Sequence, residues 1–279
     1  MEQNRPFNRI YSMEPPNQLE STTVWSFPKR GDWATHESSY RGNWAPQVPR
    51  NLILRYTNEG GSVLDPMMGS GTTLIECKIL NRRGCGFDIN PEAVALVQSK
   101  LNFALSFEQK ISATLGDARK LRDIRDNSFD LVALHPPYLD IIKYSRGCIE
   151  GDLSNHNSVE KFKEDLGLVA RECFRVLRRG GFCAVLIGDT RRSGSYIPLA
   201  FEVLGLFLGV GFLLKEDVIK LQHNCHSTSR WADIAIKRNF LLIMHEHLLI
   251  FKKPSSQISW SVEMGDCRID RFDGKTLIK

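Results

Sequence analysis

Two short motifs combine residue types that can do chemistry, and the first is a glycine loop, D-P-M-M-G-S-G-T-T, at residues 65–73. Gly69 and Gly71 let the backbone turn tightly and approach a ligand with no Cβ in the way. Asp88 and Asp117 stand at the ends of the next two expected strands. In doubly wound sheets, ligands bind outside the carboxyl ends of the strands. The pattern therefore predicts a cofactor site, with Asp88 accepting ribose hydroxyls and Asp117 facing an adenine amino group.

Simpler interpretations of the loop stay open. A strand-to-helix turn also uses glycines, and an acid at the end of a strand is often only solvated. A dinucleotide fingerprint, G-x-G-x-x-G, would need glycine at position 74, where the chain has Leu74. No Gly-Lys-Ser/Thr run follows, which excludes a P-loop. Four successive expected strands end in a polar residue, and this favours a binding site over packing alone.

The second motif is His135-Pro136-Pro137-Tyr138, directly after an apolar strand. A proline pair fixes an extended backbone and removes two N–H donors, and by itself it often only ends a strand. Facing the glycine loop across a crevice, it would present two acceptors, the side chain at 135 and the Pro136 carbonyl, to an N–H group. Such acceptors favour the nucleophilic form of a conjugated ring amine, and Tyr138 can stack on its ring.

Apolar periodicity places both motifs in an alternating fold. Strands are expected at 62–65, 84–89, 113–115, 130–134, 182–187, 213–221 and 240–251, and helices at 48–56, 72–80, from 90, at 159–177 and at 199–210. Strands that alternate with helices predict right-handed βαβ units and a parallel sheet. The last two strands, with no helix expected between them, predict an antiparallel hairpin. The fold class is therefore α/β, a doubly wound, mostly parallel, seven-stranded sheet with a terminal antiparallel hairpin.

Composition is that of an ordinary globular chain, with 42% hydrophobic and 25% charged residues. No run approaches the roughly 20 apolar residues of a membrane helix. The first residues lack the apolar segment of a secretory signal, and seven scattered cysteines suit reduced thiols. We therefore expect a cytoplasmic protein with no membrane partner. The net charge of +5 permits a polyanionic partner.

We divide the chain into a polar N-terminal arm at 1–22, a single domain at 23–253 and a tail at 254–279. Residues 23–60 hold three of the five tryptophans and precede the regular alternation of strands and helices. They form a distinct first segment of the domain.

These motifs resemble those of the DNA amino-methyltransferase family, which makes N6-methyladenine or N4-methylcytosine. Its loop reads D-P-F-x-G-S-G-T-T and its tetrapeptide reads D/N/S-P-P-Y, and the similarity extends from about residue 23 to 253. The resemblance implies a Rossmann-like methyltransferase that uses S-adenosylmethionine and no metal. Its substrate would be an exocyclic amino group of a base in duplex DNA, and such a base must first be flipped out of the helix.

The resemblance also assigns roles to particular residues. In this family a segment like 23–60 closes over the methionine end of the cofactor, and segments like 188–191 and 222–225 line the target-base pocket. The implied catalytic residues are His135, Pro136, Pro137 and Tyr138. The implied cofactor-binding residues are Trp25, Phe27, Asp65, Met67, Gly69, Gly71, Thr72, Asp88, Ile89, Asp117 and Ala118. For nucleic-acid binding we expect Lys143, Tyr144, Arg191, His223, Asn224, Arg230 and Trp231.

Two residues depart from the family pattern. Met67 replaces the loop phenylalanine, and His135 replaces the first residue of the tetrapeptide. In the family, serine there goes most often with cytosine, and aspartate or asparagine with adenine. His135 leaves the base open, and N4 of cytosine is preferred slightly over N6 of adenine. A neutral imidazole accepts an N–H bond and a protonated one does not, so we expect activity to fall as this histidine becomes protonated.

Other interpretations remain. The proline pair would also serve an RNA base amino-methyltransferase, and His135 would also suit a non-catalytic nucleic-acid-binding subunit. The cluster His223-Asn224-Cys225-His226 lacks paired ligand spacing, so no metal is expected. The basic insertion at 223–239 fits phosphate contacts and a solvated loop equally well. No block is large enough for a recognition domain, which leaves short loops, the arm, or a partner such as a restriction endonuclease or a second copy of the chain.

Overall fold

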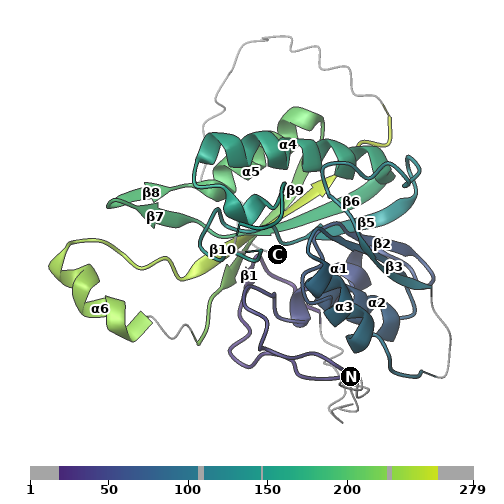
Figure 1. Ribbon diagram of the computed structural model, residues 1–279, viewed down its shortest axis with the longest axis horizontal. Helices are drawn as coiled ribbons and strands as arrows, with labels where there is room; N and C mark the ends of the chain where they lie inside the picture. Colours follow the sequence, from purple (N-terminus) through teal and green to yellow (C-terminus); the bar gives the residue numbers. More distant parts are fainter. Residues whose placement is uncertain (1–18, 106–109, 146, 225–227, 257–279) are drawn as a thin grey trace, which may run out of the picture.

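The computed structural model describes residues 19–105, 110–145, 147–224 and 228–256, and shows a sheet flanked by helices (Figure 1). Within these residues eight strands form one sheet in the order β1-β9-β10-β6-β5-β2-β3-β4. The strands are β1 (Val24–Trp25), β2 (Ser62–Asp65), β3 (Arg83–Asp88), β4 (Ile111–Leu115), β5 (Phe129–Leu134), β6 (Leu177–Ile187), β9 (Leu213–Leu221) and β10 (His245–Lys252). The helices are α1 (Gln47–Tyr56), α2 (Thr72–Ile79), α3 (Pro91–Lys100), α4 (Val159–Val176), α5 (Leu199–Val210), α6 (Thr228–Lys237) and a 3₁₀ turn, η1 (Leu153–Asn155).

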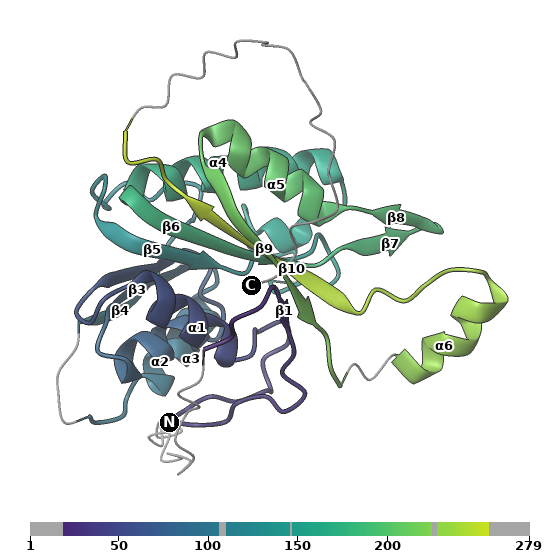
Figure 2. The same cartoon turned by 180° about the vertical axis from the view of Figure 1, so that it is seen from behind.

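Helices cover both faces of the sheet: α1, α2 and α3 lie on one face, and α4 and α5 on the other (Figures 1 and 2). Alternate residues of β5 point to opposite faces, as the pleat requires. Leu131 and Ala133 pack in the cluster that contains α1, whereas Val132 and Leu134 pack against α4 and α5. The expected α/β fold with a doubly wound, mostly parallel sheet is confirmed.

The order of the strands brings the two motifs together. β2 pairs in parallel with β3 on one side and with β5 on the other. After β2 the next strands, β3 and β4, are added on one side of it, and β5 is then added on the other side. The boundary between β2 and β5 is therefore the switch point of the sheet. The glycine loop follows β2 and the tetrapeptide follows β5, so both lie at this boundary.

The expected antiparallel pair is also confirmed, since β10 runs antiparallel to β9. β10 also pairs antiparallel with β6, and β1 adds an eighth strand along β9. Three details differ from the sequence prediction. The helix α6 lies in the 223–239 insertion, where none was expected, although Trp231, Ile234 and Ala235 repeat at helical spacing within its polar sequence. A second hairpin, β7 (Thr190–Arg192) with β8 (Ser195–Ile197), was not foreseen. β6 begins earlier than expected, because Leu177 already pairs with Phe129 of β5.

Other expectations concern helix starts, termini and membranes. α3 starts as its sequence predicts, since the Asn90 side chain accepts a hydrogen bond from the Glu92 amide at 2.9 Å. Most of the predicted arm, 1–22, and tail, 254–279, lies outside the described residues, so these domain boundaries remain predictions. No helix among the described residues is long and apolar enough to cross a membrane.

A buried carboxylate fastens the N-terminal segment to the rest of the fold. Glu76 of α2 is fully buried. Its Oε1 accepts a hydrogen bond from Trp33 Nε1 at 2.6 Å and lies 2.7 Å from His36 Nε2. Its Oε2 accepts from Arg50 Nη1 of α1 at 3.0 Å. A buried charge is tolerated only when it is paired and hydrogen-bonded, so these contacts fix residues 33–50 on α2.

Replacement of Glu76 should therefore destabilise the whole domain. Glu76→Ala leaves the donors of Trp33, His36 and Arg50 buried without their acceptor, so the free energy of unfolding should fall by about 3–5 kcal/mol. Urea denaturation followed by circular dichroism measures this value. Glu164→Ala, an exposed position on α4, is the matched control and should change it little. Equal stability of the two variants would contradict the role given to Glu76.

Candidate active site

A cleft of about 820 Å³ opens at the switch point of the sheet. It gathers most of the residues that the sequence assigned to the cofactor. Those among its lining residues are Asp65, Met67, Gly69, Thr72, Asp88, Ile89, Asp117 and Ala118. His135 and Pro137 line the same cleft from the end of β5. The floor of the cleft is thus made by the carboxyl ends of four neighbouring parallel strands.

The glycine loop depends on one left-handed residue. Gly71 caps α2 with φ of 77°, a conformation that residues with a Cβ rarely adopt. A Cβ there would also lie 2.7 Å from Val97 Cγ1 of α3. Gly71 therefore stands behind the cleft and allows the close packing of α2 on α3, while Gly69 lines it.

Asp88 is held ready by the backbone around it. Its Oδ2 accepts from the Gly69 amide at 2.9 Å, and its Oδ1 accepts from the Asn90 amide at 2.9 Å. Burial nevertheless raises the pKa of Asp88 to about 6. The carboxylate thus couples β3 to the glycine loop and remains at the cleft surface, where a pair of hydroxyl groups could reach it.

Asp65 lies deeper and organises the loop. Its Oδ2 accepts from the Thr73 hydroxyl at 2.5 Å and its Oδ1 from the Met67 amide at 3.2 Å. Burial raises the pKa of Asp65 to about 7 despite these bonds. Two carboxylates in one cleft, both reluctant to ionise without a partner, suit a ligand that brings positive charge and hydroxyl groups.

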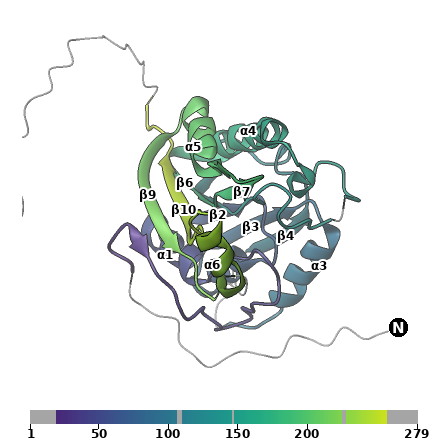
Figure 3. The same cartoon turned by 90° about the vertical axis from the view of Figure 1, so that its left-hand side faces the viewer.

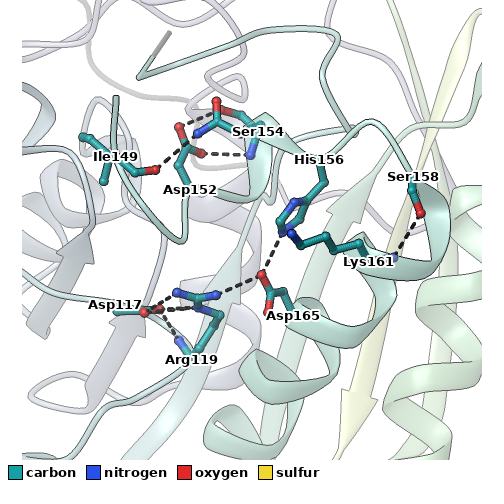
Figure 4. A network of polar contacts seen from close by, with 10 residues as sticks. Asp117, Arg119, Ile149, Asp152, Ser154, His156, Ser158, Lys161 and Asp165 are labelled. Atoms are coloured by element: carbon teal, nitrogen blue, oxygen red, sulfur yellow. Dashed lines mark hydrogen bonds and ion pairs between the residues drawn. The ribbon is translucent and has the colours of Figure 1, made fainter. Parts of the chain in front are cut away.

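Asp117 belongs to an ion-pair chain rather than facing the cleft freely (Figure 4). Arg119 donates to both of its oxygens, at 2.8 Å from Nη2 and 3.0 Å from Nε, and also reaches Asp165 at 2.9 Å. His156 Nε2 lies 2.7 Å from the same Asp165 carboxylate. Burial raises the pKa of Asp117, but the hydrogen bonds and charge of Arg119 outweigh this and hold the pKa below its usual range. Asp117 is therefore an ionised, oriented acceptor beside the cleft.

Besides Gly71, two further predicted cofactor residues do not line the cleft. Trp25 is buried in the core beside α1 and donates from Nε1 to the Thr22 carbonyl, and Phe27 packs edge-on against it. The reason is the parallel pairing of β1 with β9, which turns Trp25 into the core. Neither residue is among those lining the cleft, so their assignment to the cofactor stays a prediction that the cleft geometry does not support. The roof comes instead from Tyr40 and Trp44.

A second pocket of about 460 Å³ adjoins the cleft. His135 and Pro137 line both cavities, as do Trp44 and Tyr144. Pro136 and Tyr138 line the second pocket alone. The tetrapeptide therefore stands at the wall between a cofactor-sized cleft and a space open to a second molecule.

His135 is held on two sides. Its ring stacks on Trp44 with centroids 5.7 Å apart, and its Nε2 lies 2.7 Å from the Tyr138 hydroxyl. Burial lowers the pKa of His135 to about 4. The imidazole is therefore neutral at physiological pH and keeps one nitrogen that accepts a hydrogen bond.

Tyr138 lines the second pocket and is also held by the protein, so its stacking on a substrate ring stays a prediction. Its ring packs on Gly188, where a Cβ would come within 2.6 Å of Tyr138 Cε2. Its hydroxyl donates to Glu246 Oε1 at 2.6 Å. Tyr144 adds a further aromatic surface to the second pocket, and its ring stacks on Tyr40 with centroids 5.8 Å apart.

The residues predicted for nucleic acid fall into two groups. Tyr144 lines both cavities, with the exposed Lys143 beside it. His223 Nε2 lies 3.0 Å from the Ser26 hydroxyl, and Asn224 donates to the Pro28 carbonyl at 3.0 Å. These two contacts join the 222–224 segment to the N-terminal segment.

Arg191, Arg230 and Trp231 lie away from the cavities. Arg191 belongs to the β7–β8 hairpin, and Arg230 and Trp231 are exposed on α6. The hairpin and α6 extend from the same side of the domain (Figures 1 and 2), the side that Figure 3 brings to the front. The Arg191 guanidinium lies 5.1 Å from the Tyr196 ring of the hairpin and 5.5 Å from the ring of Phe240, which follows α6. Arg191 therefore connects the β7–β8 hairpin to the segment after α6.

Sequence analysis missed Glu246 and Lys220, which line the second pocket from β10 and β9. A sign was present in the sequence, because Glu246 stands between two histidines at the start of a mostly apolar strand, where it is buried. Cys225 and His226 of the discounted metal cluster lie outside the described residues. Among the residues that are described, no group of His, Cys, Asp or Glu is arranged to hold a metal ion.

Comparison with known proteins agrees with the geometry. The family model described as DNA methylase matches residues 2–99, and that described as RMKL-like, methyltransferase domain, matches residues 53–174. The type II methyltransferase M.HpaI of Haemophilus parainfluenzae is 49% identical over 98 residues, which are 35% of this chain and 29% of that protein. The tRNA (guanine(10)-N2)-dimethyltransferase of Pyrococcus abyssi is 29% identical over 94 residues, 33% of this chain and 28% of that protein. The matched segments thus span under a third of these relatives' own length.

Among solved structures, an S-adenosylmethionine-dependent methyltransferase of Methanosarcina mazei shares the fold, with a TM-score of 0.50 at 16% identity. The match covers 73% of this chain and 97% of the other. The fold, the glycine loop and the acids around the cleft define an S-adenosylmethionine-dependent methyltransferase domain. Within that class, the chain is related to the DNA amino-methyltransferases, as its sequence indicates.

The cleft fits S-adenosylmethionine, the cofactor expected from the sequence. Asp88 presents an oriented carboxylate to ribose hydroxyls, and Gly69 leaves room for close approach. Met67 and Ile89 offer apolar contacts, and the acidic floor suits a ligand with a sulfonium and an ammonium group. These residue roles remain predictions, which binding measurements test.

Cofactor affinity should depend on pH through the two raised carboxyl pKa values. The ionised forms of Asp65 and Asp88 attract the cationic ligand, so affinity should fall as pH drops through about 7 and about 6. We expect a loss of about 10-fold between pH 8 and pH 5.5, measured by calorimetry. Asp88→Asn should bind more weakly at pH 8 with a shallower pH dependence, whereas the exposed control Asp123→Asn should match the wild type. A flat wild-type profile would contradict these roles.

Proposed function

We propose that the protein transfers the methyl group of S-adenosylmethionine to an exocyclic amino group of a DNA base, with N4 of cytosine slightly preferred over N6 of adenine. The observation that carries the proposal is the position of His135 and Pro137 in the wall shared by the cleft and the second pocket. A donor held in the cleft and a base held in the pocket would meet at this wall.

The chain's contribution to the reaction is orientation and polarity. A bound S-adenosylmethionine supplies an electrophilic methyl group. The neutral His135 ring accepts one N–H of the target amine, and the Pro136 carbonyl accepts the other. Both bonds favour a pyramidal nitrogen with its lone pair directed at the methyl group. The proton that the methylated nitrogen sheds passes to an acceptor at the same wall, for which His135 is in position.

The pocket also supports a base taken out of the duplex. Tyr144 and Trp44 line it with aromatic surface, on which a flipped base can stack. Lys220 and Glu246 also line the pocket, where they bond to each other and Glu246 bonds to Tyr138. The neutral His135 presents an uncharged acceptor, as serine does in relatives that methylate cytosine, and the preference is slight because asparagine, which goes with adenine, is uncharged too.

The β7–β8 hairpin and α6 would bind the DNA duplex. The β7–β8 hairpin and α6 carry arginines and exposed aromatic side chains and extend from one side of the domain (Figure 3). Such a combination contacts phosphates and splayed bases. A restriction endonuclease or a second copy of the chain would supply any further recognition.

The direct test identifies the methylated nucleoside. Unmodified amplified DNA and total RNA are incubated separately with the protein and methyl-labelled S-adenosylmethionine, and the digested nucleosides are analysed by mass spectrometry. We expect labelled N4-methyldeoxycytidine from DNA. Label in N6-methyldeoxyadenosine would correct the base, label in RNA alone would overturn the substrate, and no label with bound cofactor would overturn catalysis.

His135→Ala serves as the matched variant, with turnover expected to fall about 100-fold while S-adenosylmethionine affinity is retained. Because the pKa of His135 is lowered to about 4, the neutral acceptor form persists from pH 8 to pH 5.5. Loss of activity through its protonation should appear only as pH falls toward 4. Full activity of His135→Ala would exclude the acceptor role.

Binding of DNA through α6 gives a separate prediction. The double variant Arg230→Ala with Trp231→Ala should weaken duplex binding by about 10-fold and reduce the salt dependence by about one phosphate contact. Fluorescence anisotropy across a salt series measures both. Lys161→Ala, an exposed position on α4, removes a positive charge from another face and should change neither value. Unaltered binding by the α6 variant would remove α6 from the interface.

A further inference from the structure

A continuous chain of hydrogen bonds leads from two strands of the sheet to the tetrapeptide. Lys220 Nζ of β9 donates to Glu246 Oε2 at 2.7 Å. Tyr138 donates from its hydroxyl to Glu246 Oε1 at 2.6 Å, and the same hydroxyl lies 2.7 Å from His135 Nε2. All four side chains line the second pocket.

The protons in this chain can be placed by counting donors and acceptors. Burial raises the pKa of Glu246, but the charge of Lys220, with the hydrogen bonds from Lys220 and Tyr138, outweighs it, and the net pKa is lowered. Glu246 is therefore an ionised carboxylate, which only accepts. Tyr138 has one hydroxyl proton, held because burial and Glu246 raise its pKa well above the usual value. That proton must be donated to Glu246.

The count then determines the state of His135. Since the Tyr138 hydroxyl donates its one proton to Glu246, it can only accept a hydrogen bond from the imidazole. His135 Nε2 must therefore carry the proton, and in a neutral ring the other nitrogen, Nδ1, is left as the acceptor. No hydrogen bond joins Nδ1 to any residue that the structure describes. The Trp44 ring, stacked on the imidazole, fixes its plane.

We propose that Glu246 and Lys220 are positioning residues that act through Tyr138 to hold His135 in the tautomer whose Nδ1 accepts the N–H of the target amine. This inference rests on the proposed function for its catalytic meaning, although the tautomer itself is a property of the protein alone. Aspartate, asparagine or serine at position 135 would present an acceptor without such control. A histidine has two neutral forms, and only one leaves Nδ1 free to accept.

Glu246→Gln is the informative substitution. A glutamine amide can turn its NH₂ toward Tyr138, which lets the hydroxyl donate to His135 Nε2 and moves the ring proton to Nδ1. The volume is kept, so packing changes little. Glu216→Gln makes the same chemical change at an exposed position of β9 and is the matched control.

Nitrogen-15 NMR of the full chain labelled at histidine reports the tautomer directly and needs no substrate. The His135 resonances are assigned from their absence in His135→Asn. We expect a protonated Nε2 and a bare Nδ1 in the wild type and in Glu216→Gln, and a protonated Nδ1 or a mixture in Glu246→Gln. A wild-type ring protonated at Nδ1, or a tautomer unchanged by Glu246→Gln, would overturn the proposal.

Kinetics supply the second readout. Glu246→Gln should lower kcat about 10- to 100-fold, with the KM for S-adenosylmethionine little changed, as for residues that orient a functional histidine. Tyr138→Phe breaks the same chain, so combining it with Glu246→Gln should cause no further loss. Independent, multiplying losses would contradict a single relay. If the wild type methylates no nucleic acid, the proposed function fails, and the NMR result still decides whether the relay exists.

Discussion

The structure depends on a single buried charge, the carboxylate of Glu76. It stands one helical turn beyond the glycine loop, on the helix that this loop begins, and it accepts from Trp33 and Arg50 in a segment that precedes the sheet. This anchor holds residues 33–50 over the carboxyl ends of the strands, together with the hydrogen bond from the Thr35 hydroxyl to the Lys100 carbonyl and the ion pair between Glu37 and Lys100. With these contacts, Tyr40 and Trp44 form the roof of the cleft whose floor is the sheet. The roof and floor of the site are thus joined through the interior of the protein, away from solvent.

The second constraint is topological. A parallel sheet with a reversal between β2 and β5 places two loops that are far apart in sequence on either side of one crevice. The glycine loop provides close approach and oriented amides, whereas the proline pair provides a rigid backbone with acceptors. Each loop is short and directly follows a strand whose last residues are buried, so the packing of the core fixes the geometry of the loop. A site built in this way is rigid where the reacting atoms meet and variable in the projections that would reach a larger partner.

Much of this was predictable because it is local. Apolar periodicity gave the helices and strands, and polar residues at strand ends identified the cleft. The positions of Trp25 and Phe27 away from the cleft were not foreseen, because the pairing of β1 with β9 is a long-range contact that no spacing reveals. Glu246 was missed for the same reason, since its partners, Tyr138 in the tetrapeptide and Lys220 on β9, are distant in sequence. The helix α6 escaped notice because its sequence is polar and basic overall, although its apolar residues repeat at helical spacing.

The link between β10 and the tetrapeptide also bears on how such a site changes over time. His135 and Glu246 are bridged by one hydroxyl group, so an aspartate at position 135 would bring a second negative charge close to a buried first one. The side chain at position 135 and the strand pair that carries Lys220 and Glu246 are therefore electrostatically coupled. If the four-residue motif were transferred into another protein of this fold, the histidine would lack the residues that fix its tautomer. The functional unit in this domain therefore includes β9 and β10 as well as the loop after β5, and it is larger than the sequence motif that identifies it.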